Sequence, residues 1–128
     1  MSFLITVVVI LIVWGAWFLI NRYRLKQVAN VIDESQFTQL KRRAQIIDLR
    51  EKRDFDAGHI LGARNVPYST IRQLYGDIRA DLPVILYDQG QSISTRAALF
   101  LHKKGYRKLY VLKNGYRNWN GKTKKRDA

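Results

Sequence analysis

The sequence predicts an α/β domain with a mostly parallel sheet, preceded by one membrane-spanning helix. Three observations support this: an uncharged apolar run near the N-terminus, an alternation of short apolar runs with helix-like segments after it, and apolar residues at every position of 84–87. A run of that last kind is typical of a central parallel strand, which is buried on both faces. The 128 residues favour one domain, and about 105 of them remain for a modest core.

The N-terminal run covers residues 3–20 and reads FLITVVVILIVWGAWFLI, with no charge and no proline. At a rise of about 1.5 Å per residue, some 18 residues span about 27 Å, close to the hydrocarbon thickness of a bilayer. A cleaved signal peptide would need a basic start, a shorter apolar core and a small-residue cleavage site, which this run lacks. A buried core helix is the other alternative. We predict a transmembrane helix over 1–21, with Trp14, Trp17 and Tyr23 at the membrane interfaces.

The charges that flank this helix predict its orientation. Arg22, Arg24 and Lys26 follow the apolar run, and no charged side chain precedes it. The positive-inside rule then predicts a single-pass protein of the cell membrane, with the N-terminus outside and the domain in the cytoplasm. We expect residues 22–30 to form a basic juxtamembrane linker whose three cations contact the membrane surface.

The remaining elements follow in chain order from apolar runs and from helix start and stop signals. We expect strands at 31–32, 45–49, 63–66, 84–87 and 109–112. Helices are expected from a cap at Asp33 or Ser35 to about residue 43, from Ser69 or Thr70 to residue 75, from Ser94 to Lys104 before Gly105, and as a last turn over 115–119. The domain therefore covers 31–120, and we expect the basic tail 121–128 to be disordered.

The charge balance indicates an anionic partner. The chain has 23 Lys and Arg against 10 Asp and Glu, a formal net charge of +13. Nucleic acid, anionic lipid head groups and an acidic protein surface would all be attracted by this field. No signature of interleaved aromatic and basic residues is present, so nucleic acid is the weakest of the three. The basic clusters are otherwise explained as solvated charge that keeps the domain soluble.

Cysteine is absent from the chain, which excludes disulfides, cysteine-ligated metals and thiol catalysis. The two histidines, His59 and His102, have no Cys, His or acidic neighbours at the spacing of metal ligands. We therefore expect neither a metal nor a cofactor.

Three stretches of the chain resemble the rhodanese family. The family signature is D-x-R-E, then F, then G-H-I-x-G-A-x-N-x-P. A similar series is formed here by residues 47–51 (IDLRE), Phe55 and residues 58–67 (GHILGARNVP). The strand at 84–87 is followed by a loop and a helix with Ala97 and Ala98, and Leu112, Gly115 and Trp119 are similar to the closing L-x-x-G and W. The resemblance covers roughly 31–120 and implies the family fold, a central mostly parallel five-stranded sheet with helices on both faces. It also implies structural roles for Asp48 and Arg50, as an ion pair, and for Gly58, His59, Gly62, Ala63, Gly115 and Trp119.

The resemblance further implies where chemistry would occur. In active members a cysteine follows the fourth strand, and its thiolate, held by backbone N–H groups at a helix N-terminus, takes a sulfane sulfur as a persulfide. Here Asp88 stands at that position, and Ile93 stands where active members often carry an arginine. A carboxylate has no sulfur that could carry a second one. The resemblance thus implies a member without thiosulfate sulfurtransferase activity, and the related cysteine-dependent phosphatases are excluded for the same reason.

Asp88 allows three interpretations. Its carboxylate can satisfy unpaired N–H groups near a helix start, replace the charged thiolate for a partner, or act as a new nucleophile that needs a metal. The loop Gln89, Gly90, Gln91, Ser92 is either a solvated turn in which Gly90 supplies a positive φ, or a docking or ligand-sensing loop.

We predict a non-catalytic, membrane-anchored binding or scaffold module with an unknown protein partner. An enzyme of another reaction type that uses Asp88, or an oxyanion sensor, are the alternatives.

Overall fold

The protein folds around a five-stranded parallel sheet with the strand order β1-β6-β5-β2-β4. The computed structural model describes residues 1–124, including the side chains of all of these except 24–28. The strands are β1 (Asn30–Ile32), β2 (Gln45–Asp48), β4 (Arg64–Asn65), β5 (Val84–Tyr87) and β6 (Leu109–Leu112). All four pairings are parallel, and β5 lies in the centre as its apolar sequence predicts.

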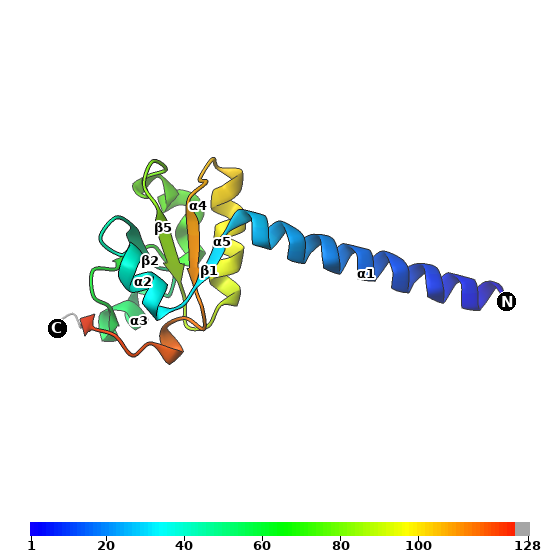
Figure 1. The fold of residues 1–128 in the computed structure, drawn as a ribbon, viewed down its shortest axis with the longest axis horizontal. Helices are drawn as coiled ribbons and strands as arrows, with labels where there is room; N and C mark the ends of the chain where they lie inside the picture. Colours follow the sequence, from blue (N-terminus) through cyan, green and yellow to red (C-terminus); the bar gives the residue numbers. More distant parts are fainter. Residues whose placement is uncertain (125–128) are drawn as a thin grey trace.

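Helices cover both faces of this sheet (Figure 1). Alternate residues of β5 point to opposite faces, so Leu86 packs beneath α5 (Ser92–Lys103) and α4 (Ile71–Leu74), whereas Ile85 packs beneath α2 (Glu34–Leu40). The remaining helix of the domain is α3 (Lys52–Ala57), and 3₁₀ turns flank α4 at Tyr68–Thr70 and Tyr75–Asp77. The predicted fold class is therefore confirmed.

Helix α1 (Ser2–Val28) projects away from the domain, beyond α5 (Figure 1). Its segment from Ser2 to Tyr23 is long and apolar enough to cross a membrane, and none of its most apolar stretch is buried inside the protein. A core helix would be buried, so that alternative does not fit the structure.

The linker expected at 22–30 is largely helical, because α1 continues through the basic residues to Val28. This stretch has no glycine or proline, and Arg, Leu, Lys and Gln favour helix. A single residue, the buried Ala29, separates α1 from β1. The apolar helix therefore leads almost directly into the edge strand of the sheet.

Several expected boundaries agree with the structure. Asp33 caps α2 in a capping box, in which its side chain accepts from the Gln36 N–H and the Gln36 side chain accepts from the Asp33 N–H. Helix α5 begins at Ser92, two positions before the predicted Ser94, and ends before Gly105, whose φ is +101°. The last turn is a short 3₁₀ helix at Tyr116–Asn118.

The prediction of a disordered tail is wrong for residues 123–124. Strand β7 (Thr123–Lys124) pairs antiparallel with β3 (His59–Ile60), a strand that the sequence did not predict. Trp119 directs the chain back to this strand, since its ring packs edge-on against Phe37 at 4.9 Å and its Nε1 donates to the Lys122 carbonyl at 3.2 Å. Residues 125–128 of the predicted tail lie outside the described residues.

Candidate functional site

The loop that follows β5 begins with Asp88, which is only 3% exposed. Its carboxylate accepts from the backbone N–H groups of Ile93 and Ser94, each at 3.3 Å, and from the Ser94 hydroxyl. These N–H groups belong to the first turn of α5, where the helix has unpaired donors and a partial positive charge. The carboxylate therefore fills the anion position that the start of α5 creates.

The carbonyl groups of this loop face the segment 114–117. The Tyr116 N–H donates to the Asp88 carbonyl at 2.8 Å, and the Arg117 N–H donates to the Gln89 carbonyl at 3.0 Å. The Gln91 side chain accepts from the Asn114 N–H at 3.3 Å. The loop is thus held by its backbone on one side and by the Asp88 carboxylate on the other.

Gly115 makes this close approach possible. Its φ is +61°, and a Cβ atom there would lie 2.1 Å from the Gly90 carbonyl oxygen and 2.4 Å from that of Asp88. Gly90, which would supply a positive φ in the interpretation of the loop as a solvated turn, does not do so. In the described part of the chain the residues in the left-handed region are Gly62, Gly105, Gly115 and Asn114. The position that requires glycine is therefore Gly115, in the segment that packs against the loop, and not Gly90 at the loop tip.

A buried polar network lies below the loop. Asp48 and Arg50 form the expected ion pair, with Arg50 Nη2 2.8 Å from Asp48 Oδ2. Arg50 also donates to the Gly58 carbonyl at 2.6 Å, and the Tyr87 hydroxyl donates to Asp48 at 2.7 Å while it accepts from the Ile60 N–H at 3.1 Å. This network joins β2, β3 and β5 beneath the site.

Two groups of this network, the Arg50 guanidinium and the Tyr87 hydroxyl, have raised pKa values. Burial acts to lower the pKa of Arg50, but the hydrogen bond to Asp48 and its negative charge outweigh burial and raise that pKa. Burial, with the neighbouring Asp48 charge, also raises the pKa of Tyr87. Arg50 thus stays cationic and Tyr87 stays a hydrogen-bond donor. The Arg50 guanidinium also contacts the loop side, since its carbon lies 4.1 Å from the centroid of the Tyr116 ring and its Nη1 lies 3.5 Å from Gln89 Oε1.

The other signature residues divide into two groups. Gly58 lies with Asp48 and Arg50 below the loop, where a Cβ atom would come 2.8 Å from the Tyr116 hydroxyl. His59 is buried and stacks on Phe55, with ring centroids 3.7 Å apart, and its Nδ1 lies 2.7 Å from the Phe55 carbonyl. Gly62, Ala63 and Trp119 lie outside the loop, in the turn after β3 and in the core beneath α2.

The exposed part of the loop is formed by Gln89, Ser92 and Ile93, of which Ile93 is 36% exposed. Arg22 is exposed on α1, whereas the side chains of Arg24 and Lys26 are outside the described residues. Within residues 1–124, His, Asp and Glu side chains form no group of three that could hold a metal ion.

Two groups near the site were missed by the sequence reasoning. The Ser94 hydroxyl binds Asp88, and the Tyr87 hydroxyl binds Asp48. The signal for Tyr87 was present, because a tyrosine that ends an otherwise aliphatic buried strand needs a partner for its hydroxyl. No comparable signal marks Ser94.

The fold and the loop define the class of protein, a rhodanese-like domain in which the carboxylate of Asp88 follows the central strand. Residues 28–122 match the rhodanese-like domain family, and the chain belongs to that family. Its lack of cysteine fits a lack of sulfurtransferase activity.

The particular relatives extend this assignment. The uncharacterized protein YqhL of Bacillus subtilis is 42% identical over 119 residues, which cover 91% of this chain and 94% of YqhL. The thiosulfate sulfurtransferase GlpE of Pseudomonas aeruginosa is 32% identical over 78 residues, 59% of this chain and 69% of GlpE. A rhodanese-related protein from Thermoplasma volcanium has the same fold, with a TM-score of 0.66 at 15% identity over 74% of this chain and 97% of that one.

Proposed function

We propose that this protein is a membrane-anchored rhodanese-like module without sulfurtransferase activity, which acts as a binding or scaffold module at the cytoplasmic face of the membrane. The observation that supports this most directly is the Asp88 carboxylate, buried on the N–H groups of Ile93 and Ser94. The position of a persulfide is occupied by an anion that cannot accept or release sulfur. The fold around it, including the Asp48–Arg50 pair, is retained.

The same geometry argues against the two alternatives. A nucleophilic Asp88 would need at least one accessible oxygen, but the carboxylate is almost wholly buried and both oxygens accept hydrogen bonds. An oxyanion sensor would need the N–H groups that Asp88 already uses. Both observations favour a structural or binding role for the loop.

An anchor formed by α1 would hold the domain near the lipid. Beyond Tyr23, five more helical residues rise only about 8 Å before the chain reaches Ala29. At this distance Arg22, Arg24 and Lys26 would contact anionic head groups, at about 1 kcal/mol for each basic residue.

The absence of cysteine makes the topology directly testable. In intact cells, a membrane-impermeant maleimide should label a Ser2→Cys variant, whereas Thr123→Cys should be labelled only after lysis. The reverse pattern would contradict a cytoplasmic domain.

The non-catalytic part of the proposal is tested by a thiosulfate:cyanide sulfurtransferase assay on the full chain in detergent. We expect no turnover above the buffer blank, and turnover that copurifies with the protein would overturn it.

For the binding role, a photo-crosslinker placed in cells at Gln91, in the loop after β5, should capture a recurrent protein that the same crosslinker at Arg79 does not. Identical products at the two positions would refute a specific binding surface at the loop.

A further inference from the structure

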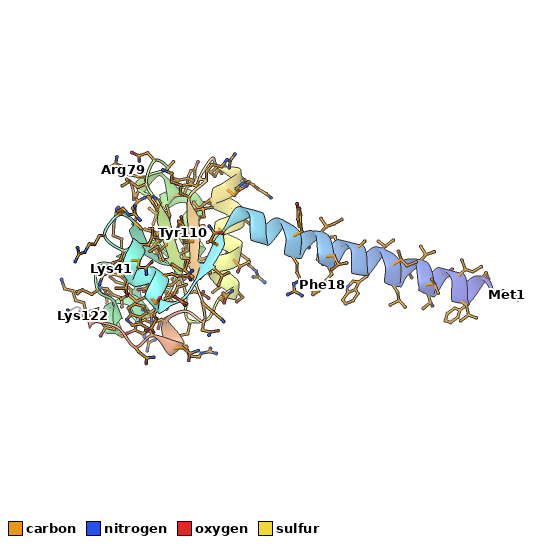
Figure 2. The ribbon with its side chains drawn as sticks, in the orientation of Figure 1. Met1, Phe18, Lys41, Arg79, Tyr110 and Lys122 are labelled. Carbon is orange, nitrogen blue, oxygen red and sulfur yellow. The ribbon has the colours of Figure 1, made fainter. Side chains whose placement is uncertain are left out.

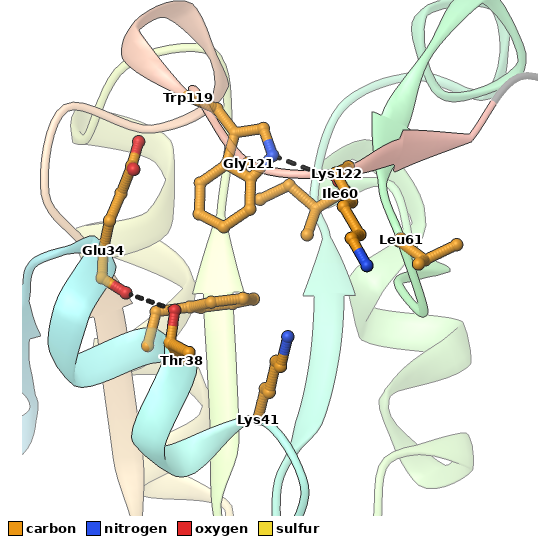
Figure 3. A pocket seen from close by; sticks show the side chains of 9 residues that line it. Glu34, Thr38, Lys41, Ile60, Leu61, Trp119, Gly121 and Lys122 are labelled. Atoms are coloured by element: carbon orange, nitrogen blue, oxygen red, sulfur yellow. Dashed lines mark hydrogen bonds between the residues drawn. The ribbon is translucent and has the colours of Figure 1, made fainter.

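A small pocket opens between α2, β3 and the segment 119–122 (Figure 3). Its volume is about 190 Å³. The apolar lining comes from Phe37, Ile60, Leu61 and Trp119, and the side chains of Lys41 and Lys122 lie at its rim (Figure 3). This pocket is separate from the loop after β5, and none of the function proposed above uses it.

The rim carries positive charge without internal compensation. Within the described residues, no carboxylate lies within ion-pair distance of Lys41 or Lys122. The one acidic residue of the lining, Glu34, lies on the other side of the pocket in Figure 3 and accepts from the Asn120 N–H at 2.8 Å. The two ammonium groups are therefore available to carboxylates of a partner.

The apolar part of the pocket is preformed. Trp119 is fixed by its ring contact with Phe37 at 4.9 Å and by its hydrogen bond to the Lys122 carbonyl. The chain at Gly121 passes so close to the indole that a Cβ atom would lie 2.3 Å from it. A ligand that enters would not need to order these groups, which lowers the cost of binding.

The size of the pocket indicates the kind of ligand. Sites for small molecules typically enclose about 300–1,000 Å³, so this pocket is too small for a drug-sized molecule but fits one side chain. Single apolar side chains that enter preformed pockets are the usual anchors of peptide and protein partners.

The position of the pocket indicates where that partner comes from. Lys41 and Lys122 lie at the end of the molecule opposite to Met1 and α1 (Figure 2). If α1 spans the bilayer, this end is directed away from the lipid, so a soluble protein can reach it and lipid head groups cannot.

We propose that this pocket docks an acidic segment of a protein partner. One leucine or phenylalanine of the partner enters between Trp119 and Leu61, and flanking carboxylates meet Lys41 and Lys122. The inference rests on the proposed binding role and adds the chemistry of the partner to it.

The probe is a fluorescein-labelled acidic peptide with one central leucine, DEELDEE, titrated with the full chain in phosphatidylcholine nanodiscs and followed by anisotropy. We expect binding that weakens at least about tenfold when the leucine is replaced by alanine, and no binding of the basic peptide KRKLKRK. Equal affinity for the leucine and alanine peptides would overturn the role of the pocket.

Matched protein variants separate this site from the general positive charge. Lys41→Glu with Lys122→Glu should weaken binding at least about tenfold, whereas Lys103→Glu with Arg107→Glu, the same change of charge at exposed positions in and after α5, should change it less than about twofold. Leu61→Lys adds a positive charge but removes an apolar wall, and should also weaken binding. Equal losses in the two double variants would overturn the proposal while leaving the crosslinking and sulfurtransferase results, and thus the proposed function, unaffected.

Discussion

Replacement of Asp88 by alanine tests whether the loop depends on its carboxylate. In the wild-type structure this group accepts from two backbone N–H groups and from the Ser94 hydroxyl, in a position that is 3% exposed. Alanine leaves these donors without an acceptor at the start of α5, and removes a negative charge from the positive end of the helix dipole.

The expected cost follows from these contacts. Each unsatisfied buried donor costs about 1–3 kcal/mol, and the charge at the helix terminus adds about 0.3–1 kcal/mol. The two N–H contacts are long, at 3.3 Å, so we take the lower end of each range and expect a loss of about 2–4 kcal/mol. For a domain of this size that lowers the melting temperature by roughly 10–20 °C.

Thermal unfolding of the full chain in detergent, followed by near-ultraviolet circular dichroism, measures this loss. Asp88→Asn keeps one oxygen acceptor and should fall between wild type and alanine. Asp81→Ala is the control, because Asp81 pairs with Arg79 on the exposed surface and its loss should not change the melting temperature measurably. An Asp88→Ala protein that is as stable as the Asp81→Ala protein would refute the reasoning.

Three further predictions follow from the same contacts. Gly115→Ala should destabilise the fold by at least about 3 kcal/mol, since its Cβ would meet the loop carbonyls at a positive φ, whereas Gly76→Ala meets no atom within 4 Å and should be tolerated in the same melting assay. Tyr87→Phe should cost about 1–3 kcal/mol at neutral pH. The pKa of Tyr87 is raised in the folded state, so its contribution to the free energy of unfolding is complete below about pH 10, where tyrosine in the unfolded chain begins to ionise. Above that pH the stability of the wild-type protein should fall, and the stability of the Tyr87→Phe protein should fall less steeply. Asp88→Cys with Ile93→Arg should form cyanide-labile sulfur from thiosulfate; a folded variant without it would show that the loop shape has changed along with its chemistry.

Much of the fold could be predicted because its signals are local. The apolar run Val84–Tyr87 identified the central strand, and Asp33, one of two expected caps beside Ser35, is the residue that caps α2. The resemblance placed Asp48 and Arg50 together, and the structure pairs them. At the site, the same resemblance predicted that Asp88 lies in a loop just before a helix, and the structure has α5 begin at Ser92.

The rest depends on contacts between distant segments. Strand β7 forms because β3 offers it a partner and Trp119 turns the chain, which two residues of local sequence do not reveal. The demand for glycine falls on Gly115 and not on Gly90, because the loop carbonyls come from another part of the chain. The pocket beside Trp119 is invisible in the sequence for the same reason, since its walls come from three separate segments.

The central claim is that the start of α5 still holds an anion, and that Asp88 is that anion. The most direct test is the thiol pKa of an Asp88→Cys variant of the full chain, measured from the pH dependence of thiolate absorbance, with Asn120→Cys as an exposed reference. A pKa well below the ordinary value of about 8.5 is predicted, because the Ile93 and Ser94 N–H groups would stabilise the thiolate. A pKa at or above that of the reference thiol would contradict the account.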